Sequence, residues 1–411
     1  MAKPASTDLG ALPATRRRSP TSFACASARP ESWRCEAVMS KLATLQVLRG
    51  LAAVTVVVDH AILRQAEWSQ TSETVMRAAE YSGALAVAVF FVISGFIMLH
   101  TSARNYGAPG AVRGFLVKRL WRIVPLYWIA TSLELALRLR AGSEVTLDRV
   151  LASYLFIPYP VAQGEYMRPL LGVGWTLNYE MFFYLLFAAS LALPIRRGLP
   201  LLFAALVSIV AFGAIFIAPL TDVSAPHTIL SFLSEPIILL FPAGMLVALL
   251  HKAGWFPIVP GALAIILLLL GENLLGFSLF VDRMPAPFVW WAATWIACAI
   301  AVGLSVAARE PQRPTPILRS GVWLGDVSYA LYLFHFFSIV AAEKIWGSLF
   351  GVAHSQIAFV AFASATSIAA AGVIHVAVEQ PIMRLSRGRN VASGPIHQTA
   401  LASFMRSFGG S

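Results

Sequence analysis

Long blocks of apolar residues dominate the sequence and constrain what the chain can fold into. A block of about 20 apolar residues has the length of an α-helix that crosses the hydrocarbon core of a bilayer. Only 12% of the residues are charged, about half the fraction of a typical soluble domain. Lone strands cannot satisfy their backbone polar groups in lipid. We therefore predict an all-α fold, a polytopic integral membrane bundle.

The apolar blocks define about ten predicted transmembrane helices. They lie at residues 45–63, 83–100, 121–138, 175–194, 199–219, 229–250, 256–272, 287–307, 323–341 and 356–378. The third is the weakest candidate because Glu134 and Arg138 lie in it. The apolar segment at residues 154–160 is too short to span, and we interpret it as re-entrant or interfacial.

The distribution of Lys and Arg among the loops predicts how the chain is oriented in the membrane. Cytoplasmic loops carry an excess of these residues, and here they gather in alternate loops, whereas the opposite loops are poor in net positive charge. Both ends of the chain are basic, so ten spans with both termini cytoplasmic is self-consistent. The net charge of +11 thus reflects membrane orientation, and we expect no nucleic-acid partner because no long basic run with interleaved aromatics is present.

Composition divides the chain into three parts. Residues 1–40 are rich in Pro, Ser, Ala and Arg, and we expect a disordered basic tail, with Met39 as an alternative start. Residues 41–385 form the predicted membrane domain, and residues 386–411 a short cytoplasmic tail. The positions of the three cysteines suggest neither a disulfide framework nor a metal site.

Arg49 and His60 are ionisable residues of the first predicted span. At about 100° per residue their spacing returns to nearly the same helix face, with Arg49 toward the cytoplasmic end and His60 in the outer half. Histidine is suited to general-base chemistry near neutral pH. The alternative is a span-end histidine that faces lipid headgroups. Asp59 is expected on another face, so we do not predict that it orients His60.

Arg119 and Arg122 open the third predicted span from the cytoplasmic side, before Pro125. Residues three apart share a helix face, and paired guanidinium groups can bind phosphate bidentately. The alternative is that both arginines are ordinary anchors at the cytoplasmic surface.

Glu180 lies in the outer half of the fourth predicted span, at a depth comparable with that of His60. An ionisable group at membrane depth is costly and is a functional candidate. Its carboxylate is suited to orienting a histidine, holding an acceptor hydroxyl or stabilising an imidazolium. The alternative is a structural pair with an arginine of another helix.

Tyr329, Tyr332 and His335 recur every three residues and share a stripe of the ninth predicted span. Such a stripe either binds substrate or holds helices together through polar contacts. His375 and Glu379 are one turn apart near the inner surface, and we expect a structural role for them.

Ser94 and Gly95 lie in the second predicted span. Small residues let helix backbones approach closely in a membrane. We therefore expect this pair to permit close helix packing or a kink.

Together these residues form an ordered set of motifs. In chain order they are Arg49-x10-His60, Phe91-Val-Ile-Ser94-Gly95-Phe96, Arg119-x-x-Arg122 with Pro125, Trp175-x-Leu-x-x-Glu180, Ser328-Tyr329-x-x-Tyr332-Leu-x-His335 and Val378-Glu379-x-Pro381. The set resembles the acyltransferase 3 family of membrane O-acyltransferases over about residues 42–385. The stretch at residues 172–184 further resembles the exopolysaccharide-production branch. Each motif alone is weak, but their order is specific.

The resemblance implies an enzyme that moves an acyl group, often acetyl, from cytoplasmic acyl-CoA to a sugar hydroxyl of a cell-surface polysaccharide or glycolipid. The essential histidine of the family matches His60, and its arginine matches Arg49. The arginine pair that holds coenzyme A matches Arg119 and Arg122. Acyl-CoA is thus a donor substrate, and we expect no tightly bound cofactor.

These assignments give an expected mechanism. Arg119 and Arg122 hold the CoA phosphates, and Arg49 stabilises the thioester oxyanion or the leaving group. His60 either deprotonates the sugar hydroxyl or briefly carries the acyl group. Glu180 orients His60 or the acceptor.

The remaining expectations concern the substrate-binding residues and the cellular location. Trp175 matches the Trp-and-Glu motif of the family, and we expect it to bind substrate together with Tyr329, Tyr332 and His335. The resemblance implies the inner membrane of a bacterium.

Two other classes of protein compete with the enzyme. A glycan transporter or flippase without acyl chemistry suits ten spans with helices broken at Pro236 and Pro242. A structural subunit of an export machine is less compatible with His60 and Glu180 at matching depth.

Overall fold

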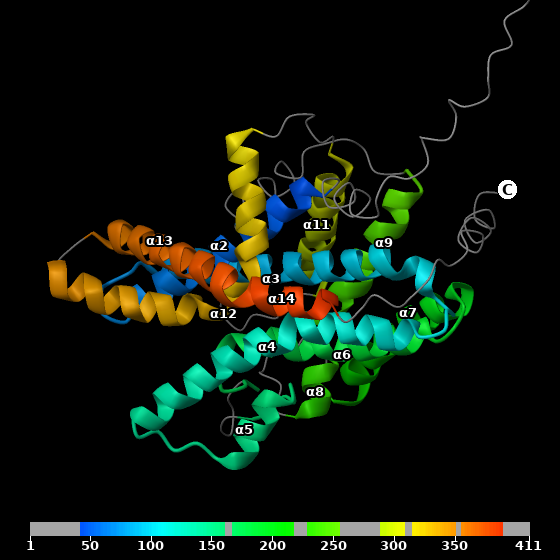
Figure 1. The fold of residues 1–411 in the computed structure, drawn as a ribbon, viewed down its shortest axis with the longest axis horizontal. Helices are drawn as coiled ribbons and strands as arrows, with labels where there is room; N and C mark the ends of the chain where they lie inside the picture. The colour runs from blue at the N-terminus through cyan, green and yellow to red at the C-terminus, as the bar shows by residue number, and fades with distance from the viewer. Residues whose placement is uncertain are drawn as a thin grey trace, which may run out of the picture. The chain divides into compact units, whose positions relative to one another are not determined.

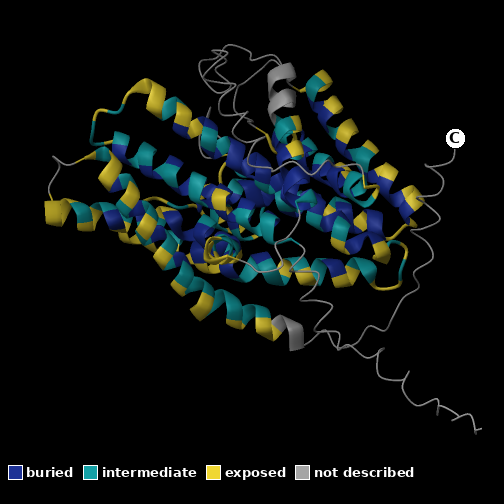
Figure 2. Cartoon of the chain, turned by 90° about the horizontal axis from the view of Figure 1, so that it is seen from above, coloured by how far each residue is buried: buried dark blue, intermediate teal, exposed yellow. Residues whose placement is uncertain are grey.

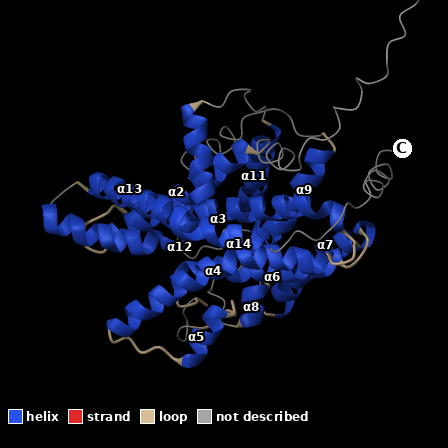
Figure 3. Ribbon diagram, in the orientation of Figure 1, coloured by secondary structure: helices blue, strands red, loops and turns tan. Residues whose placement is uncertain are grey.

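A computed structural model describes residues 42–160, 167–217, 228–254, 288–308, 315–350 and 355–388. Within these ranges the secondary structure is helical, apart from loops and one isolated β-bridge between Pro160 and Met167 (Figure 3). Seven of the described helices are long and apolar enough to cross a membrane. The predicted all-α membrane fold is confirmed, whereas the number of ten spans and the cytoplasmic termini stay predictions.

The helices follow the apolar blocks (Figure 1). In the first part of the chain they are α2 (Ala43–Ala66), α3 (Glu73–Ser102), α4 (Ala111–Arg140), α5 (Leu147–Tyr154), α6 (Trp175–Leu191), α7 (Ile195–Phe216), α8 (Ile229–Leu233) and α9 (Leu240–Lys252). They continue with α11 (Phe288–Ala307), α12 (Pro316–Phe350), α13 (Gln356–Ile374), a π-helical turn (His375–Glu379) and α14 (Gln380–Gly388). The predicted span at 256–272 and the predicted terminal tails lie wholly or almost wholly outside the described residues.

The third predicted span is a continuous helix despite its charges. Arg138 Nε donates to Glu134 Oε1 at 2.6 Å along α4, so the two charges pair within one helix. Such pairing reduces the cost of ionisable groups in a span. Pro125 also lies inside α4 without ending it.

The two prolines of the predicted broken helix behave differently. The helix is interrupted between Leu233 and Pro236, where α8 ends and a 3-10 turn begins. Pro242 instead lies in the first turn of α9. A missing N–H is tolerated at that position because the first N–H groups of a helix have no partner within it. The prediction that Pro242 breaks a helix is wrong.

α2 packs against both α12 and α3, and α13 covers α12. Glycine permits the first of these contacts. A Cβ atom on Gly325 of α12 would lie 2.2 Å from the carbonyl oxygen of Gln46 on α2, and one on Gly50 would meet Leu324 Cβ at 2.7 Å. Small residues at such crossings let helix backbones touch, which favours association in lipid.

The contact between α3 and α9 is equally close. A Cβ atom on Gly95 would lie 2.0 Å from the carbonyl oxygen of Phe241, and one on Gly244 would lie 2.0 Å from that of Val92. The close-packing interpretation of Gly95 is therefore confirmed. The contact also fixes the position of the neighbouring Ser94.

Burial follows the helix faces (Figure 2). Buried side chains gather where helices meet, whereas large apolar side chains such as Ile215, Phe216 and Ile357 are exposed on outer faces. Lipid tails are as apolar as these side chains. The exposed apolar faces are therefore the surfaces that the bilayer covers.

Candidate active site

A partly open cavity of about 100 Å³ is lined by residues of α2, α3, α4, α6 and α12. Its polar lining residues are Arg49, Ser94, Arg119, Arg122, Thr176, Glu180, Tyr184, Ser328, Tyr329 and Tyr332. We call this space the arginine cavity. It contains both arginines of the predicted phosphate pair, together with Arg49 and Glu180, although these residues come from three separate helices.

Arg49 is held by two hydrogen bonds. Its guanidinium donates to Gln46 Oε1 at 2.9 Å and to Ser328 Oγ of α12 at 3.0 Å. It also interacts electrostatically with Glu180, favourably, and with Arg122, unfavourably. Because three guanidinium groups and one carboxylate line the cavity, its lining favours an anion.

Arg119 and Arg122 lie on the face of α4 that lines the cavity, as their spacing predicts. The Arg119 guanidinium donates to Thr101 Oγ1 at 3.4 Å and lies 5.6 Å from the centroid of the Phe115 ring. Their convergence with Arg49 favours a binding role over that of two separate surface anchors.

Glu180 contacts the cavity lining and not the predicted histidine. Its Oε1 accepts hydrogen bonds from Ser94 Oγ at 3.0 Å and from the Tyr184 hydroxyl. It also interacts electrostatically with Arg49 and Arg119. The carboxylate therefore organises the arginine cavity.

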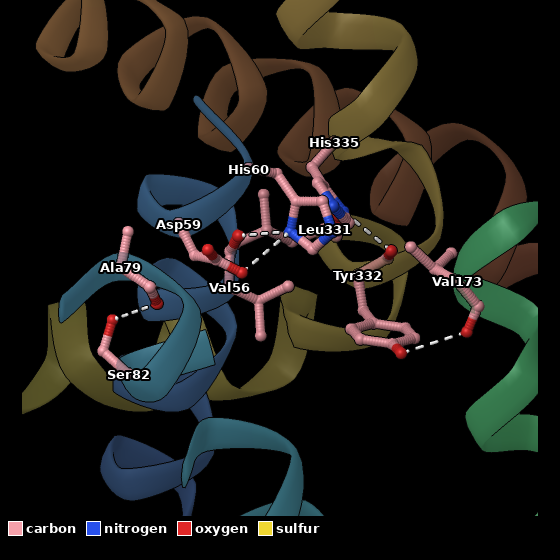
Figure 4. Close-up of polar contacts among 9 residues, drawn as sticks. All are labelled: Val56, Asp59, His60, Ala79, Ser82, Val173, Leu331, Tyr332 and His335. Carbon is pink, nitrogen blue, oxygen red and sulfur yellow. Dashed lines mark hydrogen bonds and ion pairs between the residues drawn. The ribbon is translucent and has the colours of Figure 1, made fainter. Parts of the chain in front are cut away.

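His60 lies against His335 of α12, with ring centroids 4.9 Å apart and an interplanar angle of 64° (Figure 4). We call these residues the histidine pair. His60 Nδ1 donates to the Val56 carbonyl at 2.9 Å, and Asp59 Oδ2 is 3.4 Å from the same nitrogen. The expectation that Asp59 points away from His60 is therefore wrong. Helix position alone separates neighbouring residues by about 100°, but both side chains reach toward the preceding turn.

Tyr332 lies between the two groups of residues. Its ring lines the arginine cavity, and its centroid is 6.1 Å from that of His335. Its hydroxyl donates to the Val173 carbonyl at 3.0 Å (Figure 4). The same hydroxyl is 2.8 Å from Thr176 Oγ1, next to the start of α6. The histidine pair thus adjoins the arginine cavity through the wall that contains Tyr332.

The other predicted substrate residues occupy different environments. Tyr329 lines the cavity, and its hydroxyl donates to the Ile123 carbonyl of α4 at 2.8 Å. The tyrosine stripe therefore both lines the cavity and links helices. Trp175 lies outside the cavity lining and packs against Tyr179, with ring centroids 5.9 Å apart.

His375 and Glu379 form the predicted pair, directly after the C-terminal end of α13. His375 Nδ1 is 2.7 Å from Glu379 Oε2 within the π-helical turn. Glu379 and Asp326 also interact electrostatically with Arg49. Together they add negative charge beside the arginine cavity.

Four polar lining residues were not assigned a catalytic or binding role from the sequence: Ser94, Thr176, Tyr184 and Ser328. Tyr184 follows Glu180 by one helical turn, a spacing that places the two side chains on one face. Ser94 and Ser328 occur inside motifs, but the partner of each lies on another helix. Among the described residues, no group of three or more His, Cys, Asp or Glu side chains is arranged to hold a metal ion.

Comparison with known proteins identifies the family. A family model described as an acyltransferase domain, acyltransferase 3, matches residues 42–376. The exopolysaccharide production protein ExoZ of Rhizobium meliloti (strain 1021) is 34% identical over 315 residues, which cover 76% of this chain and 93% of that protein. The acyltransferase MdmB of Streptomyces mycarofaciens is 30% identical over 390 residues, 86% of this chain and 95% of that protein.

A more distant relative is nodulation protein 10 of Rhizobium leguminosarum bv. viciae, 29% identical over 296 residues, 61% of this chain and 70% of that protein. No solved structure matches the chain. The family match spans most of the sequence and includes the helices that form both the arginine cavity and the histidine pair. The chain therefore belongs to the acyltransferase 3 family and is a multi-pass integral membrane acyltransferase.

Proposed function

We propose that this protein transfers an acyl group, acetyl in the simplest case, from cytoplasmic acyl-CoA to a sugar hydroxyl of an exopolysaccharide or another cell-surface glycan. The main supporting observation is the convergence of Arg49, Arg119 and Arg122 in a cavity that adjoins the histidine pair. The name of the relative ExoZ supports an exopolysaccharide as the acceptor. The protein would act in the inner membrane of a bacterium.

The arginine cavity is the proposed donor site. Guanidinium groups suit the phosphates of CoA because they bind them through charge-assisted hydrogen bonds. We assign the phosphates to Arg119 and Arg122, and the thioester oxygen or the leaving sulfur to Arg49. A cavity of about 100 Å³ is smaller than the roughly 300 Å³ or more that encloses a drug-sized ligand. We therefore propose that the acyl-pantetheine arm enters the cavity, with its phosphates held by Arg119 and Arg122 where it enters, while the adenosine stays outside.

The histidine pair is the proposed transfer site. The side chain of His60 is 31% exposed, so it is accessible to an acceptor hydroxyl. His60 either removes the hydroxyl proton or carries the acyl group as an intermediate. We assign substrate contacts to Tyr329 and Tyr332, and an acceptor contact outside the arginine cavity to Trp175.

The arginine pair provides the test of this function. Membrane vesicles that contain the protein receive radiolabelled acetyl-CoA and a glycan extract. We expect wild-type vesicles to label glycan, and the double variant Arg119→Ala/Arg122→Ala to raise the KM for acetyl-CoA by at least about tenfold. Each lost hydrogen bond to a charged group is worth about 1.5–3 kcal/mol, which corresponds to that factor or more.

The matched control replaces two exposed cations of the same helix, Arg113→Ala/Lys118→Ala, and we expect an unchanged KM. An equal KM for the wild type and the arginine-pair variant would contradict the donor assignment. No labelling with any short-chain acyl-CoA would overturn the proposed function. Loss of glycan export without any acylation would favour the flippase alternative.

A further inference from the structure

His335 of α12 is fully buried. Its contacts show which of its two ring nitrogens carries the hydrogen atom. Its Nδ1 lies 2.8 Å from the Tyr332 carbonyl oxygen and 3.2 Å from the Leu331 carbonyl oxygen. A carbonyl oxygen only accepts hydrogen bonds, so Nδ1 must donate. In a neutral imidazole the other nitrogen, Nε2, is then an acceptor with a free lone pair.

This Nε2 atom has no hydrogen-bond partner among the described residues, although it is buried. Buried polar atoms are nearly always paired, because leaving one unpaired costs free energy. This acceptor is therefore available to a donor that forms during function. The nearest ionisable ring is that of His60, against which His335 packs (Figure 4).

His60 has the same arrangement. Its Nδ1 donates to the Val56 carbonyl, so the Nε2 atom of its neutral ring is also an acceptor. The two neutral rings thus have no hydrogen atom to share. A proton taken up by His60 at Nε2 changes this, because the new N–H group can donate to a neighbouring acceptor. The ring centroids are 4.9 Å apart, so the two rings are in direct contact and His335 is the neighbour that such an N–H group meets first.

We propose that His335 is a positioning residue for acyl transfer, and that its Nε2 accepts a hydrogen bond from His60 when His60 holds the proton of the acceptor hydroxyl. The inference rests on the proposed function. In the transfer, the hydroxyl O–H bond breaks and a bond forms between that oxygen and the acyl carbon. The C–S bond of the thioester breaks, and its electron pair stays on sulfur. His60 holds the released proton, which ends on the CoA sulfur as a thiol.

If His60 instead carries the acyl group as an intermediate, His335 Nε2 acts in the second step, in which the acceptor takes the acyl group. The acyl carbon bonds to His60 Nε2 as the C–S bond breaks. The acceptor oxygen then takes the acyl carbon, and the hydroxyl proton passes to the imidazole nitrogen that the acyl group leaves, from which it ends on the CoA thiolate as a thiol. His335 Nε2 accepts from that N–H group as in the direct route. The proposal therefore does not depend on which route operates.

Two amide substitutions separate the two nitrogens of His335. In His335→Asn the amide can replace Nδ1 and donate to the Tyr332 carbonyl, but it leaves no acceptor at the place of Nε2. In His335→Gln the amide reaches the place of Nε2 and can accept there, while the Nδ1 contact is lost. Ser338→Ala, one turn further along α12, is the control for altered packing.

The experiment measures acetyl transfer to glycan in vesicles at saturating acetyl-CoA, per folded protein, together with the KM for acetyl-CoA. We expect His335→Asn to lower kcat about 10–100-fold, the factor for a hydrogen bond to a charged group, and His335→Gln to keep a clearly higher kcat. The KM for acetyl-CoA should stay unchanged in both variants, because His335 does not line the arginine cavity.

The outcomes distinguish the inference from the function on which it rests. Wild-type turnover combined with equal or greater activity in His335→Asn than in His335→Gln would overturn the role of Nε2 and favour a purely structural anchor. A kcat that is unchanged in both variants would overturn it as well. Absence of acetyl-CoA turnover in the wild type would overturn the proposed function itself.

Discussion

Replacing His60 by alanine is expected to lower the rate of acyl transfer to glycan by about 10²–10⁴-fold, the usual contribution of a positioned acid–base group. His60 is the partly exposed member of the histidine pair, and Val56 and Asp59 hold its Nδ1 edge. Alanine removes both the proton acceptor and any site for an acyl intermediate. The measurement is the incorporation of label from acetyl-CoA into glycan, in vesicles with equal amounts of folded protein.

The control for this prediction is His251→Ala. His251 lies at the end of α9, where its ring is 6.4 Å from that of His100, and it contributes to neither the arginine cavity nor the histidine pair. We expect this variant to retain normal transfer. Turnover in His60→Ala within a few fold of the wild type would refute the assignment of His60.

The same vesicles address the two chemical routes. Exchange of label between free CoA and acetyl-CoA, in the absence of glycan, requires an acyl-enzyme. If His60 carries the acyl group, the wild type catalyses this exchange and His60→Ala does not. If transfer is direct, neither protein catalyses it, while glycan labelling still depends on His60.

The residues of the arginine cavity could be predicted from the sequence because charge at membrane depth is rare and costly. Arg49, Arg119, Arg122 and Glu180 stand out for this reason, and the three-residue spacing of the arginine pair places both on one helix face. The structure brings all four into one cavity. The α-helical fold was predictable on similar grounds, since each span must satisfy its own backbone in lipid.

The contacts of these residues were less predictable, because they depend on how helices cross and which rotamers the side chains adopt. The sequence suggested that Glu180 orients His60 or the acceptor, since Glu180 and His60 lie at similar depth in their spans. In the structure Glu180 faces Ser94 on α3 and Tyr184 on its own helix, whereas His60 faces His335. Depth along a helix is readable from residue numbers, but rotation of one helix relative to another is not.

The division of the site has a chemical consequence. If the arginine cavity holds the acyl thioester as proposed, the acyl group must reach His60 across the wall that contains Tyr332, whose hydroxyl is bonded near the start of α6. Phe90 of α3 extends the same wall, with its ring centroid 6.1 Å from that of Tyr332. Under the proposed function, such a wall would shield the thioester from water on the side of the histidine pair, which would limit wasteful hydrolysis.

The second large effect is expected at the contact between α3 and α9. Gly95→Ala and Gly244→Ala should each destabilise the folded protein by about 1–3 kcal/mol or more, the range for overpacked interiors. The added Cβ atoms would lie 2.0 Å from the carbonyl oxygens of Phe241 and Val92, respectively. Backbone atoms cannot rotate away as a side chain can, so the helices must separate. The measurement is the apparent melting temperature of the protein purified in detergent.

Gly114→Ala on α4 is the matched control, because a Cβ atom there would meet nothing within 4 Å. Alanine favours a helix over glycine by about 1 kcal/mol, so this variant should be as stable as the wild type or more so. The double variant Gly95→Ala/Gly244→Ala should cost less than the sum of the single changes, because one separation of the helices relieves both clashes. It should also lower acyl transfer, since a shift of α3 moves Ser94 away from Glu180. Wild-type melting of Gly95→Ala would contradict the close packing of α3 on α9.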